Sequence, residues 1–474
     1  MTLNQQTREE VDLDALVAVL DAYGMDLREI TDVVASLILL RWLDLADAEA
    51  AAEAAFEERT HLPLFPPGLQ WRSWCGAESL EIADRLDAVA QRVTTTVADT
   101  GPGVHLRLLS APLKRLLQLN PAYLADAVQW VAALPMETPS ERRAALQAFD
   151  SLLTKAATPY DAESATPTSL AKLMVSLADP RPGESVFDPS FGRAGLLVSA
   201  WRHAEASHTG RPHRPGALID IAGVEINPQA FLLGLTRLIL AGAASARLAL
   251  GNSLESDLVR GTAKSGFDVI LANPPIGAKT QRDNGGYHQF PFVTPDLTGM
   301  FVQQTIAQLK PQGRAVMAVP EGFLFRSGVE CALRRSLIEQ GQVEAVIGLP
   351  AGVFLPYTGV KGSLLVLRKH GNVDRIRMVD ATPFFEPAKG KRPAMLRGPM
   401  ADQLVQMVRG VALPGSQRAR IERGPGWARY RPSIEKHLGG FHPRPCGSRM
   451  GLASSPSRKG LVGRASGSLE RGQW

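Results

Sequence analysis

The sequence predicts an α/β protein in which a helical domain precedes a doubly wound, Rossmann-like parallel sheet. From Thr7 to about Lys155 the apolar residues recur at intervals of three and four, which is typical of amphipathic helices. After Thr158, short apolar runs alternate with helical stretches, the pattern of strand and helix units that form parallel sheets. Such sheets bind ligands outside the carboxyl ends of their strands, so the residues that end each strand are candidates for a site.

The chain is longer than one hydrophobic core usually organises, because its 474 residues exceed the size at which chains divide into domains. The pattern predicts a helical domain (1–155), an α/β domain (156–370) and a carboxyl-terminal extension (371–438). The last segment (439–474) is rich in Gly, Ser, Arg and Pro, which predicts a disordered basic tail.

The composition is that of a soluble globular protein, with 45% hydrophobic and 21% charged residues. No apolar stretch reaches the roughly 18 to 20 residues that span a bilayer, and the start is polar and acidic rather than signal-like. We therefore expect a cytoplasmic protein without a membrane partner. Cys75, Cys331 and Cys446 lack the paired spacing of zinc sites, so neither a metal nor a disulfide is expected.

The net charge of +5 is compatible with a polyanionic partner, although many proteins share such a mild excess. The basic residues are unevenly placed, since the stretch from Arg418 to Arg458 is rich in Arg and almost free of acids. Any contact with nucleic acid is therefore expected to involve the later part of the chain.

Pro and Gly predict breaks in the helical domain at 61–69, 99–103 and 135–139. In the α/β domain a helix is expected at 228–243. Seven runs bounded by turn residues predict strands, at 185–189, 221–226, 246–252, 267–273, 313–320, 343–350 and 363–368.

The first predicted strand ends in Asp188, and a turn containing Gly192 and Gly195 leads into an apolar helix. Such a turn lets a nucleotide-like ligand approach the backbone, and an acid at the strand end suits a ligand amine. The glycine spacing differs from the dinucleotide fingerprint, which disfavours a nicotinamide oxidoreductase. The alternative is that Asp188 only caps the helix.

Glu225 ends the second predicted strand, in GVEINPQA. A carboxylate there can accept hydrogen bonds from both ribose hydroxyls of a bound nucleoside. The gap from Asp188 is longer than in dinucleotide enzymes, because the His- and Arg-rich stretch 202–215 intervenes. The alternative is again a helix-capping carboxylate.

The fourth predicted strand ends in FDVILANPPIGAK, which is the most specific feature. Asn273 offers a side-chain carbonyl and Pro274 a main-chain carbonyl, and Pro274 and Pro275 stiffen the loop. Two such acceptors can face the hydrogens of a conjugated amine, such as N6 of adenine, and localise its lone pair for attack on a sulfonium methyl group. Alone an Asn-Pro-Pro sequence is often only a turn, but here it lies beside the other two features.

These three motifs resemble those of the amino-methyltransferases of DNA, and among them the modification subunit of type I restriction systems. DPSFGRAGLL is similar to that family's cofactor loop, and ANPPIG to its catalytic Asn-Pro-Pro-Phe. The resemblance covers about Ala157 to Lys369, including ATPTSLAKLMVSLADPRPGE before the loop and GRAVMAVPEGFLFRSG after it. The helical first part agrees with the family only in kind.

The resemblance implies a class I methyltransferase sheet, S-adenosylmethionine as cofactor, and methylation of adenine N6 in DNA. The implied catalytic residues are Asn273, Pro274, Pro275 and Ile276. The implied cofactor residues are Thr166 and Pro167 at the methionine end, Asp188, Gly192 and Gly195 in the loop, Glu225 at the ribose, Asn252 at the adenine, and Asn273. The implied partners are DNA and a specificity subunit, with a restriction subunit as a further candidate.

Three residues depart from the family pattern. Ile276 stands where the family has an aromatic side chain that stacks on the flipped adenine, so stacking is expected to weaken. Asn252 replaces an Asp, a change that its amide carbonyl can tolerate, and Ala194 replaces a common glycine, which should be mild.

A loop after the catalytic motif carries other aromatic residues, Tyr287, Phe290 and Phe292. They are candidates to replace the missing stacking platform, or else they anchor the loop by packing on the domain. His288, in the same loop, is expected to be incidental.

Two further hypotheses remain open. Methylation of a protein glutamine poses the same electronic problem and is handled by similar Asn-Pro-Pro loops. Alternatively, Ile276 marks a degenerate subunit that binds the cofactor or partner subunits without turnover.

Overall fold

A computed structural model describes most of the chain between residues 17 and 423. The described ranges are 17–18, 21–22, 24–95, 109, 113–114, 116–156, 166–207, 218–255, 266–279, 287, 289–355, 358–371, 375–390, 392–410 and 420–423. Within these ranges no helix is both long and apolar enough to cross a membrane.

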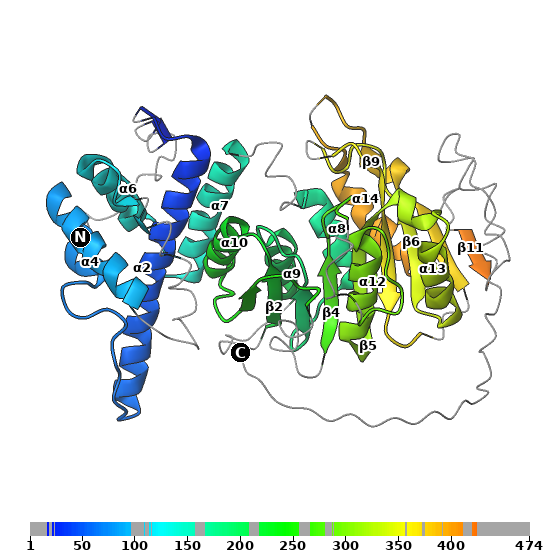
Figure 1. Cartoon of the computed structure of the whole chain (residues 1–474), viewed down its shortest axis with the longest axis horizontal. Coiled ribbons are helices and arrows are strands. Elements are labelled where there is room, and N and C mark those ends of the chain that lie inside the picture. Colours follow the sequence, from blue (N-terminus) through cyan, green and yellow to red (C-terminus); the bar gives the residue numbers. More distant parts are fainter. Residues whose placement is uncertain are drawn as a thin grey trace, which may run out of the picture.

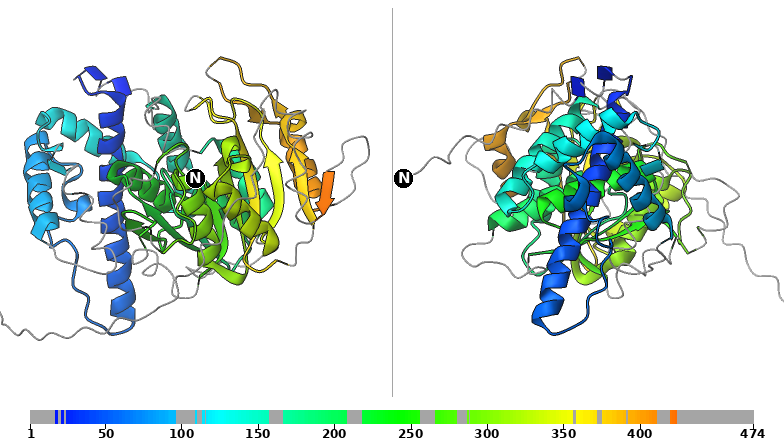
Figure 2. Two further views of the ribbon diagram at one scale, coloured as in Figure 1. Left: turned by 45° about the vertical axis from the view of Figure 1, so that its right-hand side comes forward. Right: turned by 90° about the vertical axis from the view of Figure 1, so that its left-hand side faces the viewer.

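The first part of the chain is helical, as the sequence predicts. Its helices are α2 (Leu27–Phe56), α3 (Trp71–Trp74), α4 (Ser79–Thr95), α6 (Pro121–Ala133) and α7 (Pro139–Lys155). The breaks expected at 61–69 and 135–139 are present, whereas 99–103 lies outside the described residues. Asp26 caps α2, and Thr138 and Glu141 form a capping box at α7, so local sequence fixes where both helices begin. The long α2 runs past the neighbouring helices at its carboxyl end (Figures 1 and 2).

The second part forms one nine-stranded sheet in the order β11-β8-β6-β7-β5-β4-β1-β2-β3. Its strands are β1 (Ser185–Asp188), β2 (Asp220–Glu225), β3 (Arg247–Leu250), β4 (Phe267–Ala272), β5 (Leu309–Pro320), β6 (Val343–Gly348), β7 (Gly362–Arg368), β8 (Arg375–Asp380) and β11 (Arg420–Arg423). β7 is antiparallel between β5 and β6, and β11 is antiparallel to β8, whereas the other pairings are parallel. The seven predicted strands are confirmed, and so is the doubly wound α/β sheet.

Helices cover both faces of the sheet. α8 (Thr168–Ala178), α9 (Gly195–Ser207), α10 (Pro228–Ala241) and α14 (Gly398–Val408) contribute to one buried apolar cluster. α12 (Leu297–Gln308) and α13 (Val329–Glu339) contribute to a second cluster on the other face, seen in front of the strands in Figure 1. Short elements complete the fold: η3 (Glu321–Leu324), η4 (Thr382–Phe384), and the hairpin of β9 (Phe385–Glu386) and β10 (Met395–Leu396).

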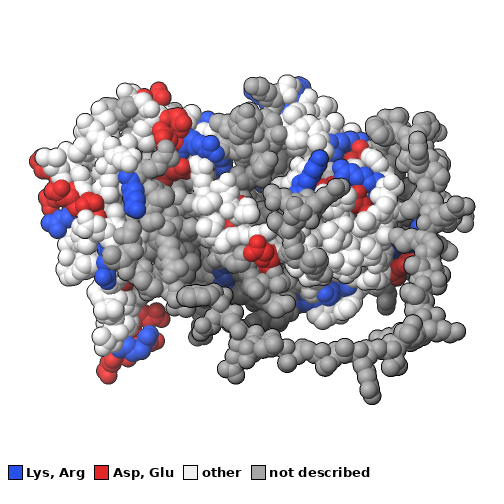
Figure 3. Space-filling view, viewed as in Figure 1, with Lys and Arg blue, Asp and Glu red and all other residues white. Residues whose placement is uncertain are grey.

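The helical domain is fixed to the α/β domain through α10, which contacts both α2 and α7. The first apolar cluster continues without a break from α8, α9 and α10 into the helical domain. Gln229 donates to both carboxylate oxygens of Asp32, at 2.9 and 2.8 Å, and Arg237 pairs with Asp150 at 2.7 Å. On the face shown in Figure 3, acidic side chains lie at the outer edge of the helical domain and basic ones are interspersed.

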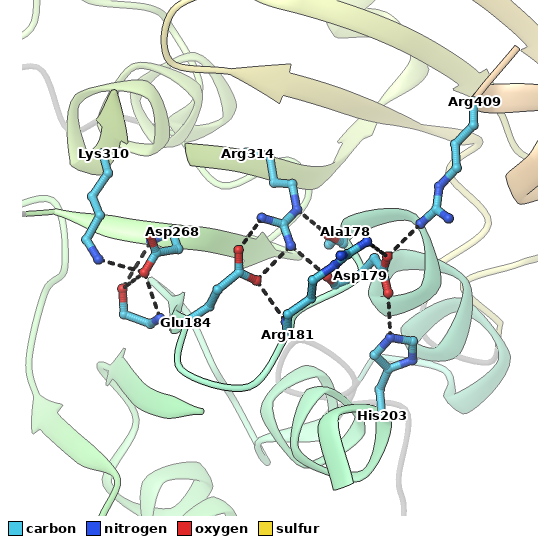
Figure 4. Close-up of polar contacts among 10 residues, drawn as sticks. Ala178, Asp179, Arg181, Glu184, His203, Asp268, Lys310, Arg314 and Arg409 are labelled. Atoms are coloured by element: carbon cyan, nitrogen blue, oxygen red, sulfur yellow. Dashed lines mark hydrogen bonds and ion pairs between the residues drawn. The ribbon is translucent and has the colours of Figure 1, made fainter. Parts of the chain in front are cut away.

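A polar network joins the carboxyl-terminal segment to α8 at the amino ends of the strands (Figure 4). Arg314 donates to both oxygens of Glu184, each at 2.8 Å, and to the carbonyls of Ala178 and Asp179. The Asp179 carboxylate pairs with Arg409 at 3.2 Å and bonds His203 at 3.0 Å. Burial alone would raise the pKa of Asp179, but the His203 hydrogen bond and the neighbouring arginines outweigh it, so the pKa is lowered.

The sheet also continues beyond residue 370, where the sequence pattern weakens. β8 pairs in parallel with β6, and α14 packs on α8. The basic stretch 418–458 lies outside the described residues except for Arg420–Arg423, and the tail 439–474 lies wholly outside them.

Candidate functional site

The site lies at the carboxyl ends of β4, β1 and β2, three adjacent strands of the sheet. Asp188 ends β1, Glu225 ends β2, and Asn273 directly follows β4. Because the three strands are parallel, their carboxyl ends meet at one edge, which brings the three predicted motifs together.

The loop after β1 is tightly turned. Asp188 is only 1% exposed, and its Oδ1 accepts from the backbone N–H of Ser190 at 3.0 Å. Gly192 and Ala194 both have left-handed backbone, with φ of 53° and 56°, before α9 begins at Gly195. A side chain at φ above zero is strained, which explains why glycine suits the position of Ala194. Asp188 bonds within the turn and accepts no N–H of α9, so the capping alternative is not favoured.

Burial raises the pKa of Asp188 to about 8, with the hydrogen bond from Ser190 lowering it and the negative charge of Glu225 raising it. A carboxyl group in this position is therefore protonated near neutral pH and poised to ionise when a positive charge approaches. This behaviour agrees with the expectation that the group faces a ligand amine.

Glu225 connects the two loops of the cofactor side. Its Oε2 accepts from the N–H of Gly192 and its Oε1 from the N–H of Asn227, both at 2.8 Å. The cap of α10 is Asn227, which accepts from Gln229 and Ala230, so Glu225 is not the helix cap. Each carboxylate oxygen retains acceptor capacity for a ligand hydroxyl.

Phe191 holds the loop against α10, a feature that the sequence did not reveal. Its ring packs against Phe231 with centroids 5.3 Å apart, and its N–H donates to the carbonyl of Val224 at 3.2 Å. Glycines make room for it: a Cβ at Gly223 would lie 2.7 Å from the Phe191 ring, and one at Gly234 would lie 2.9 Å from the Gly192 carbonyl oxygen. A glycine inside a helical pattern was the available signal.

Asn273 is held by a contact to a distant segment. Its Nδ2 donates to Oγ1 of Thr166 at 3.2 Å, which leaves the Oδ1 to act as an acceptor. Pro274 is buried, while Asn273, Pro275 and Ile276 are half-buried, and Ile276 packs on the first apolar cluster. Pro167 precedes α8 as its N-cap residue, so the start of that helix sets the position of Thr166.

The residues expected around a nucleoside are less uniform. Asn252 uses its Oδ1 to accept from the N–H of Leu254 at 3.1 Å, a local turn contact. Ile226, which follows Glu225, is 67% exposed and was not singled out from the sequence. This exposed apolar side chain, next in sequence to Glu225, offers an apolar surface for a purine ring.

The aromatic loop packs on the domain. Tyr287, Phe290 and Phe292 are half-buried against the second apolar cluster. Gln303 clamps the backbone of Phe292, accepting from its N–H at 2.9 Å and donating to its carbonyl at 2.7 Å. These contacts favour the anchoring role over the stacking role. His288 lies outside the described residues.

Comparison with known proteins agrees with this geometry. The N-6 DNA Methylase family matches residues 147–409. The chain is 27% identical over 347 residues to the methylase subunit of the type I restriction enzyme EcoEI from Escherichia coli, covering 70% of this chain and 69% of that one. It is 30% identical over 215 residues to the StySPI methylase subunit from Salmonella potsdam, covering 43% of this chain and 40% of that one.

A solved structure from a type I restriction-modification system shares the fold. It superposes with a TM-score of 0.72 at 22% sequence identity, covering 95% of this chain and 93% of that one. The similarity therefore extends over the helical part, for which the sequence motifs gave no specific signal.

Proposed function

We propose that this chain, which belongs to the N-6 DNA methylase family, transfers a methyl group from S-adenosylmethionine to N6 of adenine in DNA. We further propose that it acts as the modification subunit of a type I restriction-modification system, together with a specificity subunit and, in the full system, a restriction subunit. The observation that carries the proposal is Asn273, held by Thr166 at the carboxyl end of β4 beside Asp188 and Glu225.

The residues at the site fit S-adenosylmethionine, which supplies an electrophilic methyl group when bound. The buried carboxyl of Asp188 would bind the ammonium group of its methionine part, because ionisation there needs a positive partner. Glu225 would accept from the ribose hydroxyls, Gly192 and Gly195 would let the cofactor approach the backbone, and Thr166 and Pro167 would bound the methionine end. Asn252 and the exposed Ile226 would contact its adenine.

The chemistry assigned to the loop is positioning of the target amine. The lone pair of adenine N6 is delocalised into the ring, so the amine is a poor nucleophile until its hydrogens are held. Asn273 Oδ1 and the Pro274 carbonyl would each accept one of those hydrogens, and the two prolines keep both acceptors in place. The rate then depends on orientation rather than on a strong base, and the proton leaves after the methyl group has been transferred.

The target adenine must leave the duplex to reach this edge of the sheet. Ile276 would give the extruded base an apolar contact in place of aromatic stacking, since the aromatic side chains of the following loop are engaged with the domain. We therefore assign the loss of stacking a cost in rate rather than a loss of function.

The test is to incubate the purified chain, with its specificity subunit, with labelled S-adenosylmethionine and both unmethylated DNA and total cell protein. The proposal predicts label in DNA alone. Label in protein glutamine with none in DNA would establish the second enzymatic hypothesis. Cofactor binding by calorimetry with no label in either fraction would establish a degenerate subunit.

A further inference from the structure

An open groove of about 670 Å³ lies on the α8 and α9 face of the sheet, between α7, those two helices and the β10–α14 segment. One end is formed by Thr166 and Gly195, and the other by Ser176 and His203. The groove follows α8 from Thr168 to Ser176, a span of about 12 Å at 1.5 Å per residue. In Figure 4, His203 bonds Asp179 at the carboxyl end of α8.

The groove is strongly basic. Among the described residues that line it are four permanent cations, Lys172, Arg193, Arg202 and Arg237, and one acid, Asp150. Arg237 pairs with Asp150 at 2.7 Å, so that carboxylate is already neutralised.

Two of these cations, Lys172 on α8 and Arg202 on α9, are exposed at the rim. Neither makes a hydrogen bond or an ion pair with any part of the chain that the structure describes. Both cations are therefore available to pair with an anion that enters the groove.

We propose that this groove binds backbone phosphates of the DNA strand that carries the target adenine. The inference rests on the proposed function. The strand next to the extruded base would run along the groove. At about 3.4 Å per nucleotide along one strand, a span of about 12 Å accommodates three or four nucleotides.

The connection to the catalytic loop favours this ligand over a compact anion. Thr166, at one end of the groove, holds Asn273, so a strand in the groove would lead directly to the residue that holds the amine. Asp188 and Glu225 do not line the groove, so the groove meets the proposed cofactor site only at its end, at Thr166 and Gly195. Its open shape and its exposed cations suit a continuous polyanion, whose affinity comes from several contacts of this kind.

The experiment uses the complete complex, meaning this chain together with its specificity subunit. It measures binding of a fluorescent 30-base-pair duplex, without cofactor, over a range of salt concentrations. Replacing both Lys172 and Arg202 by Ala should weaken binding and lower the slope of log affinity against log salt by about 2, and each single variant by about 1. The charge-preserving double variant, Lys172→Arg with Arg202→Lys, should have the same slope as the unaltered protein. Arg335→Ala is the matched control, since Arg335 is an exposed arginine on α13, on the opposite face of the sheet.

An unchanged slope in the double variant, or an equal decrease in Arg335→Ala, would overturn the proposal. So would failure of the charge-preserving pair to restore binding, because that result would indicate a structural role. The measurement needs no turnover, so its outcome does not depend on methyl transfer. A complex that binds DNA through the groove but transfers no methyl group would refute the activity alone, and normal methylation with an unchanged slope would refute the groove alone.

Discussion

The role of Asp188 depends on its protonation state, which its position in the sequence does not reveal. Its pKa of about 8, raised mainly by burial, means that the carboxyl is protonated at pH 6.5 in the free protein. A ligand ammonium beside it would drive ionisation. We predict that binding of S-adenosylmethionine at pH 6.5 releases about one proton, measured as the buffer dependence of the calorimetric enthalpy. Asp188→Asn should abolish that release; an unchanged release would exclude Asp188 as its source.

The raised pKa of Asp188 also determines how the free energy of unfolding changes with pH. The folded protein holds the Asp188 proton more tightly than the unfolded chain, whose carboxyl has the ordinary pKa of 3.8. The contribution of this group to the free energy of unfolding is therefore complete below about pH 4 and is lost as the pH rises towards 8. Asp188→Asn should flatten that part of the pH profile in chemical denaturation without cofactor.

We predict that an aromatic side chain at position 276 raises the rate of methyl transfer. If the extruded adenine lies against this side chain, an aromatic ring there would add stacking worth about 1 kcal/mol, or about a fivefold rise in kcat/KM. Ile276→Phe is the variant and Ile276→Leu the control, measured as methyl transfer to DNA. A fall in activity with Phe, at unchanged cofactor affinity, would place the target base elsewhere.

At the residue scale, the sequence predicted which residues end the strands, but it could not predict contacts between distant segments. Asp188, Glu225 and Asn273 end the first, second and fourth predicted strands, so their shared edge follows from the parallel sheet alone. The bond between Asn273 and Thr166 joins residues 107 positions apart, and no local pattern indicates it. Phe191 was equally hidden, because its role depends on how α10 approaches the loop.

At the scale of elements, α10 and the cofactor loop form one packed unit. A Cβ added at Gly234 would lie 2.9 Å from the Gly192 carbonyl oxygen, a backbone atom that cannot rotate away. We predict that Gly234→Ala displaces the loop, costs about 1 to 3 kcal/mol of stability and weakens S-adenosylmethionine binding at least about tenfold, measured by thermal unfolding and calorimetry.

Gly348→Ala is the control, since Gly348 ends β6, outside the proposed cofactor site. A Cβ there would lie 3.8 Å from the Val379 carbonyl oxygen, an ordinary contact, so its effect on cofactor affinity should stay within about threefold. A larger loss of cofactor affinity with Gly348→Ala than with Gly234→Ala would contradict this account.

The elements also show where sequence patterns stop being informative. The seven strands from β1 to β7 follow from apolar runs between turn residues, and all were predicted. β8 is only partly apolar, since charged residues make up half of RIRMVD, so its pairing with β6 depended on tertiary contacts. The antiparallel direction of β7 likewise cannot be derived from its own residues, because a strand buried on both faces has the same pattern in either direction.

For the whole molecule, the central feature is that the helical domain completes the core of the α/β domain. α10 is buried along almost its whole length, between the sheet and the helices α2 and α7. Removing residues 1–155 would expose this apolar surface and break the pairs of Gln229 with Asp32 and of Arg237 with Asp150. We predict that 156–474 alone aggregates in size-exclusion chromatography. A monomeric fragment that binds cofactor normally would contradict that view.

Arg237 connects this docking to the site, since it also donates to the carbonyl of Arg193 in the cofactor loop. Through this side chain, Asp150 of α7 is linked to the cofactor loop. We retain 156–370 as the proposed extent of the catalytic pattern, with β8 and α14 extending its fold.

The most direct test of the central claim is Asn273→Ala in the complete complex. Labelled S-adenosylmethionine and unmethylated DNA are supplied, the DNA is digested to nucleosides, and cofactor affinity is measured separately by calorimetry. We predict label in N6-methyladenine with the unaltered protein, and loss of that label in the variant by at least about a hundredfold with nearly unchanged cofactor affinity. Undiminished N6-methyladenine in the variant would contradict the account.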